Sequence, residues 1–257
     1  MGTMAESPAA AAQPLPRLAR VQAAAQSIAK RLGPRLGLGL IAALIVVVLF
    51  GALASEVREG DTQNFDDSVR MSIHGVASPQ ATKLLFFATQ LGSPLALLPL
   101  TLVCSLLFLH WRRIRAAILL TVTMAGVTFL SWLLKLIFQR ARPVPFFGIT
   151  TPASYSFPSG HSLASFCFYG ALAALLTARL RSPVLRGAVW AAAIVIIVAV
   201  GFSRLYLGMH YPSDVIGGYA TGFVWVLAVA SADRIFRPAD ERGSAAAVAE
   251  PPPGGPS

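Results

Sequence analysis

Charged residues are scarce in this chain of 257 residues. Asp, Glu, Lys and Arg together make up only 12% of it, whereas hydrophobic residues make up 55%. Soluble domains usually carry about 25% charged residues. The shortage of charge therefore indicates a membrane protein. Acidic residues are the scarcer kind, with 11 Asp and Glu against 21 Lys and Arg.

The excess of positive charge does not indicate a partner nucleic acid. The basic residues form no single patch and fall in short clusters between apolar runs, as membrane topology requires. Cysteine is also scarce. Cys104 and Cys167 both lie inside apolar runs, and they form neither a zinc-binding nor a redox spacing. We expect both to pack as small apolar side chains.

Six apolar runs account for most of the remaining chain. Most of them approach the ~20 residues that cross a bilayer. Backbone polar groups cannot stay unpaired in lipid, so the runs should be helices. The sequence thus predicts an all-α polytopic membrane protein with six transmembrane helices and both termini on one side. The runs are Leu36–Ala54, Pro94–Leu109, Ala116–Phe138, Leu163–Ala178, Ala188–Phe202 and Val215–Ala232.

Positive charge predicts the orientation of these helices. Of the 21 Lys and Arg residues, 14 fall in the two tails and in the loops after the second and fourth runs. Six fall in the opposite loops, and Lys135 lies inside a run. Because Lys and Arg are enriched in cytoplasmic loops, we expect both termini in the cytoplasm. The Ala- and Arg-rich composition indicates a bacterial inner membrane.

The chain divides into three regions. Residues 1–35 are expected to form a flexible basic cytoplasmic tail, mobile or lying on the membrane surface. Residues 36–235 should form the six-helix membrane domain, and residues 236–257 a disordered cytoplasmic tail. Ala52–Leu53–Ala54 looks like a signal-peptide cleavage site, but the long basic region before the first run and the length of that run favour an uncleaved span.

The longest connection, Ser55–Ser93, follows the first run. Within this connection, Lys83–Phe87 is a candidate for a segment at the membrane interface. Whether the connection gates the substrate or only joins two spans stays open. Apolar residues at helical spacing predict a helix lying on the membrane here, namely Phe65, Val69, Ile73 and Val76.

The stretch Ser203–Asp214, between the fifth and sixth runs, is the first of three that carry chemistry. Pro212 fits the first turn of a helix, which places Asp214 one turn beyond His210. A carboxylate there can accept a hydrogen bond from one imidazole nitrogen, which fixes the tautomer and leaves the other nitrogen as a nucleophile. Arg204 offers a planar charged fork suited to phosphate. The alternative is an ordinary interfacial loop with a capping aspartate.

The second stretch closes the third run. Lys135 stands inside that run, and an ionisable residue within a span is a functional candidate by default. Arg142 follows about two helical turns later, so the two face the same way if the helix persists, although Pro143 disfavours helix at Arg142. A lysine that reaches to the interface is the alternative. Arg140 has no partner in this pattern and is interpreted as a solvated flank.

The third stretch, Pro158–Ser159–Gly160–His161, opens the fourth run. Ser159 or a neighbour can cap that helix, and Gly160 lets the backbone come close to a ligand. Free N–H groups at a helix N-terminus bind anions. His161 there can donate a proton to a leaving oxygen, which a plain helix cap would not explain. The predicted topology brings all three stretches to the outer membrane face, where they describe a phosphate pocket.

The three stretches resemble the motif of the type 2 phosphatidic acid phosphatase superfamily. The motif reads lysine, six residues, Arg-Pro; then Pro-Ser-Gly-His; then Ser-Arg, five residues, His, three residues, Asp, and this sequence matches it without a departure. The resemblance covers roughly residues 36–235. Soluble vanadium haloperoxidases share the motif, but the six spans disfavour that group.

The resemblance implies metal-independent dephosphorylation of lipid phosphates through a phosphohistidine, with no cofactor. By the same resemblance His210 is the nucleophile, Asp214 its orienting partner and His161 the general acid. The phosphate-binding groups that it implies are Lys135, Arg142, Ser159, Gly160 and Arg204. The active site is expected at the outer membrane face.

The function predicted is that of an integral membrane lipid phosphatase or diphosphatase of the cell envelope. Undecaprenyl diphosphate, phosphatidylglycerol phosphate and phosphatidate are all compatible substrates, and the sequence does not indicate an oligomeric state. A phosphotransferase that hands the phosphoryl group to another lipid is the alternative within the same chemistry. A transporter would need polar residues in several spans near the midplane, and the intact motif argues against a catalytically silent scaffold.

Overall fold

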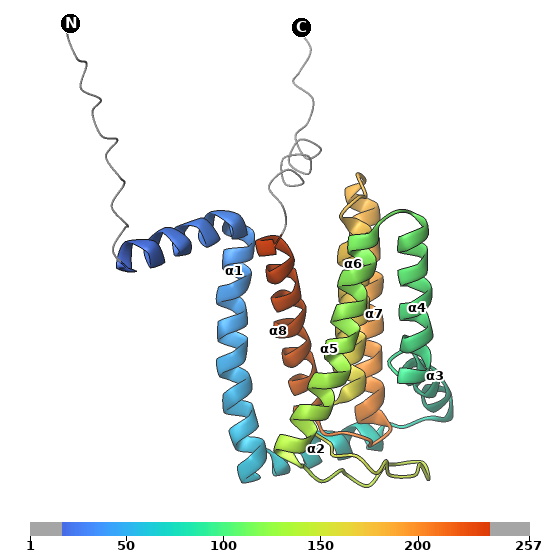
Figure 1. The fold of residues 1–257 in the computed structure, drawn as a ribbon. Helices are drawn as coiled ribbons and strands as arrows, with labels where there is room; N and C mark the ends of the chain where they lie inside the picture. The colour runs from blue at the N-terminus through green and yellow to red at the C-terminus, as the bar shows by residue number, and fades with distance from the viewer. Residues whose placement is uncertain (1–16, 237–257) are drawn as a thin grey trace, which may run out of the picture.

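The computed structural model describes the backbone of residues 17–236 and the side chains of residues 37–235. This part of the chain forms eight helices and no strand, as Figure 1 shows. The helices are α1 (Arg17–Glu59), α2 (Gln63–Gly75), α3 (Pro79–Gln90), α4 (Pro94–His110), α5 (Ile114–Phe138), α6 (Gly160–Thr177), α7 (Pro183–Tyr206) and α8 (Pro212–Phe236).

Five of the described helices are long and apolar enough to cross a membrane, namely α1 from Gly37 onward, α5, α6, α7 and α8. The second predicted span corresponds to α4, which has only 17 residues. It qualifies together with α3, across a bend of 47°. If this bent pair is one span, the described residues hold six. The predicted all-α polytopic membrane fold is therefore confirmed.

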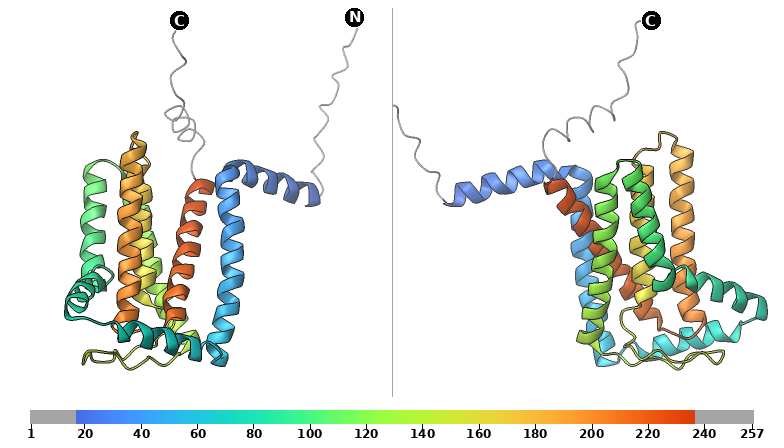
Figure 2. Two further views of the ribbon diagram at one scale, coloured as in Figure 1. Left: turned by 180° about the vertical axis from the view of Figure 1, so that it is seen from behind. Right: turned by 45° about the vertical axis from the view of Figure 1, so that its right-hand side comes forward.

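Helix α1 extends further toward the N-terminus than the first apolar run. It begins at Arg17, inside the segment 1–35 that the sequence predicts as a tail. Figures 1 and 2 show this first part running at a steep angle to the part that lies along the bundle. The remainder of that predicted tail, and the predicted tail from residue 237 onward, lie outside the described residues.

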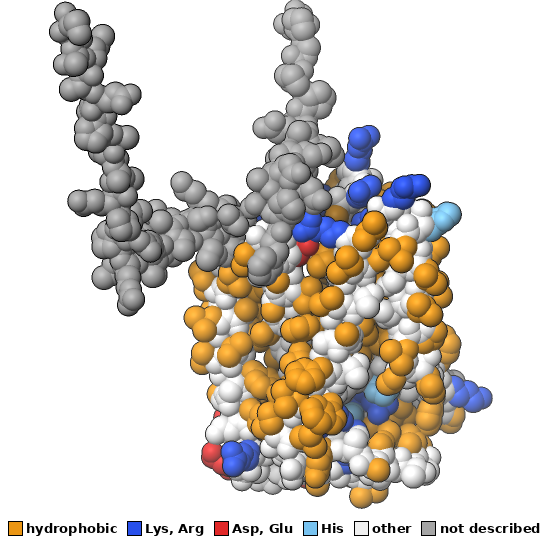
Figure 3. All heavy atoms as spheres, viewed as in Figure 1, with side chains coloured by type: hydrophobic (Ala, Val, Ile, Leu, Met, Phe, Trp, Pro, Cys, Tyr) orange, Lys and Arg blue, Asp and Glu red, His pale blue; other side chains and the backbone are white. Residues whose placement is uncertain are grey.

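Helix α6 forms the centre of the bundle and packs against α5, α7 and α8. Leu163, Cys167 and Phe168 on α6 are buried together with Leu97 of α4 and Leu120 of α5. Cys167 thus packs as a small apolar side chain. Apolar side chains also cover the flank of the bundle, whereas Lys and Arg gather toward its ends, as Figure 3 shows. This distribution suits a surface surrounded by lipid.

Two glycines allow close helix contacts. A Cβ on Gly126 of α5 would lie 2.0 Å from the Trp225 ring of α8, and one on Gly218 of α8 would lie 2.7 Å from the Ser159 carbonyl oxygen. Small residues at helix interfaces let backbones approach closely inside a membrane. The second contact holds the start of α6 against the first turns of α8.

Serine residues cap the N-termini of several helices. Ser78, Ser93 and Ser182 cap α3, α4 and α7, and each is followed by a proline. The hydroxyl accepts an otherwise unpaired N–H group, and the fixed φ of proline suits the first helical position. Ser159 caps α6, where its hydroxyl accepts from the Ser162 N–H, so the predicted cap is confirmed.

Helices α2 and α3 lie across the end of the bundle opposite the described chain ends, as both views of Figure 2 show. The predicted helix within Ser55–Ser93 is α2. The side chains that α2 buries are the polar Asp66 and Arg70, whereas Phe65 and Met71 are more than half exposed. This helix therefore turns charge toward the bundle and apolar side chains away from it.

Candidate active site

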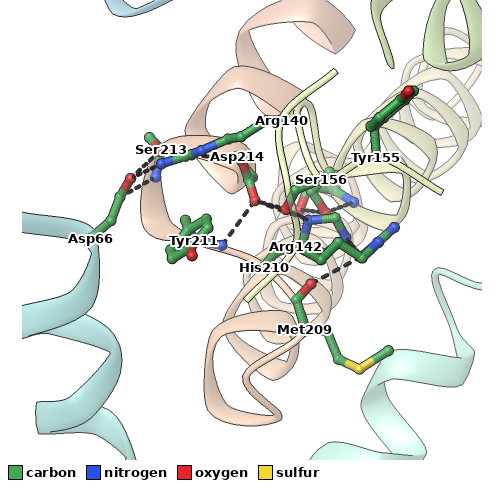
Figure 4. Close-up of polar contacts among 12 residues, drawn as sticks. Asp66, Arg140, Arg142, Tyr155, Ser156, Met209, His210, Tyr211, Ser213 and Asp214 are labelled. Carbon is green, nitrogen blue, oxygen red and sulfur yellow. Dashed lines mark hydrogen bonds and ion pairs between the residues drawn. The ribbon is translucent and has the colours of Figure 1, made fainter. Parts of the chain in front are cut away.

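The three chemistry-bearing stretches meet at the end of the bundle that α2 and α3 cover. They are the connection between α5 and α6, the first turn of α6, and the connection between α7 and α8. Figure 4 shows the polar contacts that join the connection between α5 and α6 to the connection between α7 and α8 around His210.

His210 is held at both ring nitrogens and is only 1% exposed. Its Nδ1 lies 3.2 Å from Asp214 Oδ2, and its Nε2 lies 3.0 Å from Arg142 Nη1. Arginine can only donate a hydrogen bond, and a carboxylate can only accept one. Nδ1 therefore carries the proton, while the lone pair of Nε2 points toward the guanidinium of Arg142.

Burial also keeps this imidazole neutral. It lowers the pKa of His210 to about 3, even though the hydrogen bond to Asp214 acts in the opposite direction. The positive charges of Arg142 and Arg204 contribute to the lowering. A neutral imidazole is the form that can act as a nucleophile, so the ring is in that form at neutral pH.

Asp214 lies in the first turn of α8 and is fully buried. Besides His210, its Oδ2 accepts from the Tyr211 N–H at 2.9 Å and from the Ser156 hydroxyl. Its backbone oxygen accepts from the Ser159 N–H at 2.9 Å. Two connections, the one between α5 and α6 and the one between α7 and α8, thus hold Asp214 in place.

Arg142 reaches the site along an extended segment. Helix α5 ends at Phe138, and Gln139 after it has the left-handed conformation, with φ of 44°. The helix does not persist to Arg142, the condition under which Lys135 and Arg142 would face the same way, because the left-handed residue ends it before Pro143. The guanidinium is held by the Ser154 carbonyl and hydroxyl and by the Met209 carbonyl, at 2.6–3.0 Å.

Two further cations approach the same place. Arg204 donates to Thr89 Oγ1 at 2.7 Å, and its buried Nε has no hydrogen-bond partner among the described residues. Lys135 donates to the Tyr155 carbonyl at 2.7 Å. Lys135, Arg142 and Arg204 lie close enough for each charge to act on the others. Such a cluster of like charges is favourable when an anion lies among them.

The start of α6 completes the site. Ser159 is buried as the cap, Gly160 is the first residue of the helix, and His161 follows. The imidazole of His161 is partly exposed and makes no side-chain hydrogen bond to the described residues. It lies within electrostatic reach of His210 and of the three cations. All eight residues that the sequence singles out are therefore brought together at one end of the bundle.

Arg140 is a participant that the sequence missed. Its side chain is only 9% exposed, and it donates to Asp214 Oδ1 at 2.8 Å and to Asp66 Oδ2 at 2.7 Å. The interpretation as a solvated flank is wrong, because two buried carboxylates hold the guanidinium inside. Burial alone would lower the pKa of Arg140, but the charges of Asp214 and Asp66 raise it. Asp66 lies 74 residues earlier, so no local spacing could reveal the pair.

Comparison with known proteins identifies the family. The model of the PAP2 superfamily matches residues 116–236, which include all three stretches. Phosphatidylglycerophosphatase B of Bacillus subtilis is 31% identical over 180 residues, covering 69% of this chain and 87% of the relative. The chain belongs to the PAP2 superfamily. The resemblance drawn from the motif is confirmed, and with it the hydrolase class of a PAP2 membrane lipid phosphatase.

Other PAP2 proteins agree with this placement. The crystal structure of a transmembrane PAP2 type phosphatidylglycerolphosphate phosphatase from B. subtilis superimposes with a TM-score of 0.70 at 29% identity, covering 76% of this chain and 97% of that one. An undecaprenyl-diphosphatase of Sulfolobus acidocaldarius is 33% identical over 144 residues, covering 54% of this chain and 64% of the relative. The helical arrangement and the chemistry-bearing segments are thus those of PAP2.

Proposed function

We propose that this PAP2 protein hydrolyses a phosphomonoester or diphosphate of a membrane lipid through a phosphohistidine at His210. The observation that carries the proposal is the state of the His210 ring. Its Nε2 is unprotonated, its Nδ1 is bound to a buried carboxylate, and Arg142 stands directly beside the lone pair. A phosphoryl group placed at Arg142 would therefore meet the nucleophile.

In the first step, Nε2 of His210 attacks phosphorus in line and the bond from phosphorus to the lipid oxygen breaks. Its electron pair stays on the leaving oxygen, which takes a proton from His161. Arg142 Nη1 turns its hydrogen bond from Nε2 to a phosphoryl oxygen. Asp214 stabilises the positive charge that the phosphorylated imidazole carries.

In the second step, a water molecule attacks the phosphohistidine. His161, now unprotonated, takes the proton of that water. The bond between Nε2 and phosphorus breaks, and its electron pair returns to the ring. Inorganic phosphate leaves in this step from either substrate, because a phosphomonoester has already released the lipid alcohol and a diphosphate the lipid monophosphate. The site returns to its starting protonation state.

Cationic side chains stabilise the charge that spreads over the equatorial oxygens. The positive charge comes from Lys135, Arg142 and Arg204, which lie on three segments of the chain. The N–H groups of the capped α6 N-terminus add their dipoles. The unpartnered Nε of Arg204 is a buried donor that a phosphoryl oxygen can satisfy. We infer a metal-independent reaction, because fixed positive side chains occupy the role that a metal has in other phosphatases.

The site faces outward in this proposal, with both termini in the cytoplasm of a bacterial inner membrane. The charge asymmetry of the loops supports this orientation. Cysteine labelling of intact cells tests it, in a variant whose two native cysteines are replaced. Thr151→Cys, in the exposed connection beside the site, should react with an impermeant reagent from outside. Val184→Cys, at the exposed start of α7, should not. The reverse pattern would overturn the orientation.

Phosphate release from a panel of lipids tests the activity. Purified protein in detergent is given phosphatidylglycerol phosphate, undecaprenyl diphosphate and phosphatidate, with the first favoured because the relative matched over most of its length is a phosphatidylglycerophosphatase. His210→Ala should release no phosphate, and His110→Ala, an exposed histidine at the other end of the bundle, should behave as wild type. Release from none of the three lipids by wild-type protein would overturn the proposal.

A further inference from the structure

A buried ion cluster lies behind the candidate nucleophile, on the side away from Arg142. It consists of Asp66 from α2, Arg140 from the connection between α5 and α6, and Asp214 from α8. Both aspartates are fully buried and the side chain of Arg140 is only 9% exposed. The cluster joins three elements that are far apart in the sequence, as Figure 4 shows.

Arg140 divides its guanidinium between the two carboxylates. Nη1 donates to Asp214 Oδ1 at 2.8 Å and to the Ser213 hydroxyl at 2.6 Å, while Nη2 donates to Asp66 Oδ2 at 2.7 Å. The Tyr211 ring lies 4.2 Å from the guanidinium carbon, which restricts the plane of the fork. A planar fork with fixed donors specifies the direction of each carboxylate as well as its charge.

Asp66 fixes the other side of this arrangement. Its Oδ1 accepts from the Ser213 N–H at 3.0 Å, and its Oδ2 accepts from the Ser213 hydroxyl at 2.6 Å. Ser213 directly precedes Asp214 in the first turn of α8. Asp66 therefore binds both Arg140 and the backbone that carries Asp214, so it holds the guanidinium and the first turn of α8 in register.

The two oxygens of Asp214 have separate partners. Oδ2 faces His210, Ser156 and Tyr211, whereas Oδ1 accepts from Arg140. Rotation of the carboxylate toward or away from the imidazole would break the bond to Arg140. Removing that cation would also leave a buried negative charge uncompensated, which is costly in a low-dielectric surrounding. The orientation of Asp214 thus depends on Arg140.

We propose that Arg140, held by Asp66, is a positioning residue that aligns Asp214 for the nucleophile His210. The inference rests on the proposed function of the site. It also assigns a role to α2, which the sequence leaves as a gate or a plain connector. Through Asp66 this helix supports the orientation of the candidate catalytic aspartate, while its apolar residues Phe65 and Met71 face away from the bundle.

The kinetic signature of such a role is a loss of kcat without a change in KM. Arg140 contacts Asp214, and Asp66 contacts Arg140 and Ser213, so no hydrogen bond or ion pair joins either residue to the three cations of the pocket and substrate binding should be unaffected. Arg140→Gln should lower kcat by about 10- to 100-fold, the loss usual when a partner that orients a functional side chain is removed. KM should stay at its wild-type value, whereas inhibition by vanadate should weaken, because vanadate mimics the five-coordinate state that the aligned His210 stabilises.

Related variants separate positioning from general stability. Arg140→Lys keeps a charge but not the fork, so its kcat should lie between those of wild type and Arg140→Gln. Asp66→Asn should lower kcat less than Arg140→Gln. The double variant of Asp66→Asn and Arg140→Gln should lower kcat by less than the product of the two single fold-losses. The reason is that the two residues act through one network. Asp67→Asn is the matched control, since the neighbouring Asp67 of α2 is about half exposed and its side-chain polar contacts to the described residues are with Gln63 and Arg70.

The experiment measures kcat, KM, vanadate inhibition and the thermal midpoint of wild type, His210→Ala and these variants, with phosphatidylglycerol phosphate in detergent. A lowered kcat at constant KM, partly restored in Arg140→Lys, supports the positioning role. Folded Arg140→Gln with the kcat of Asp67→Asn would overturn it, as would equal losses in the Lys and Gln variants. If Arg140→Gln does not fold, Arg140→Lys and Asp66→Asn decide by the same criteria. An inactive wild type would refute the proposed function itself, which is a separate result.

Discussion

The connection between α7 and α8 and the start of α6 each bring one histidine to the site, and they hold it in opposite ways. His210 is buried, and its ring nitrogens are held by Asp214, Arg142 and Ser156. His161 is partly exposed and makes no side-chain hydrogen bond within the described part of the chain. A nucleophile needs one fixed tautomer, whereas a proton donor that later serves as a base needs room to move.

The largest effect is expected from removing the fixed histidine. His210→Ala should abolish turnover, because no other described side chain at this position can form the bond to phosphorus. Trapping of the phosphoenzyme after brief reaction with ³²P-labelled substrate should show label in wild type and none in the variant. Turnover near the wild-type rate in a folded His210→Ala protein would mean that the phosphohistidine assignment is wrong.

Removing His161, which makes no side-chain hydrogen bond to the described residues, should give a loss that depends on the leaving group. General acid catalysis contributes about 10²–10⁴-fold, and a lipid alcohol needs a proton more than a lipid monophosphate does. His161→Ala should therefore slow phosphatidate most, undecaprenyl diphosphate less, and p-nitrophenyl phosphate least. A bound phosphate favours the protonated acid, because its negative charge offsets the repulsion from Lys135, Arg142 and Arg204.

The measurement for this variant is the pre-steady-state burst with each of the three substrates. Steady-state rates would hide the trend if dephosphorylation of His210 became limiting. The same loss on all three substrates would show that His161 binds phosphate and is not the acid. That result would also remove the contrast in role between the hydrogen-bonded His210 and the unbonded His161.

A smaller loss is expected when the fixed histidine keeps its place but loses its anionic partner. In a serine protease the corresponding Asp→Asn change costs about 10⁴-fold through the wrong tautomer. Here Arg142 still donates to Nε2, which keeps the proton on Nδ1, so Asp214→Asn should cost less, about 100- to 1,000-fold. Single-turnover rates with phosphatidylglycerol phosphate give the value. A loss as complete as that of His210→Ala would assign Asp214 a second role in the reaction.

The low pKa of His210 predicts that its ring keeps the same protonation state between pH 7 and pH 5. Because burial holds the pKa near 3, the ring should stay neutral over this range, as ¹⁵N NMR of histidine-labelled protein would show, with His210→Ala assigning the signal. An unfolded histidine titrates near 6.5. Stability from this group is therefore lost progressively as the pH falls from about 6.5 toward 3, because the unfolded chain binds the proton first. Titration of the folded signal near 6.5 would contradict this environment.

The smallest effect is expected from a chelator. If Lys135, Arg142 and Arg204 supply the positive charge, EDTA should leave phosphate release unchanged. Vanadate should inhibit, because it forms the five-coordinate geometry of the transferring phosphoryl group beside His210. Loss of activity in EDTA that Mg²⁺ restores would show that the cationic side chains do not suffice.

The sequence predicted the helices and the chemistry-bearing residues because both depend on local signals. Apolar runs gave the spans, and histidines, cations and a Ser-Gly helix start are rare enough in such a chain to stand out. Arg140 and Asp66 carried no such signal, since their meaning comes from a contact across 74 residues. The third apolar run ends at Phe138, as α5 does, but the residue that ends the helix carried no such signal. Gln139 adopts a left-handed conformation that its residue type does not demand.

The contact between Gly218 and Ser159 has a consequence for how the site can vary. The start of α6 carries His161 and the start of α8 carries Asp214, and the missing side chain at residue 218 lets these two helix ends touch. The separation between proton donor and nucleophile is thus set by a residue with no chemistry of its own. A single methyl group added at Gly218 would push the two apart. Variation at this position would therefore impair catalysis while every reactive side chain remained present.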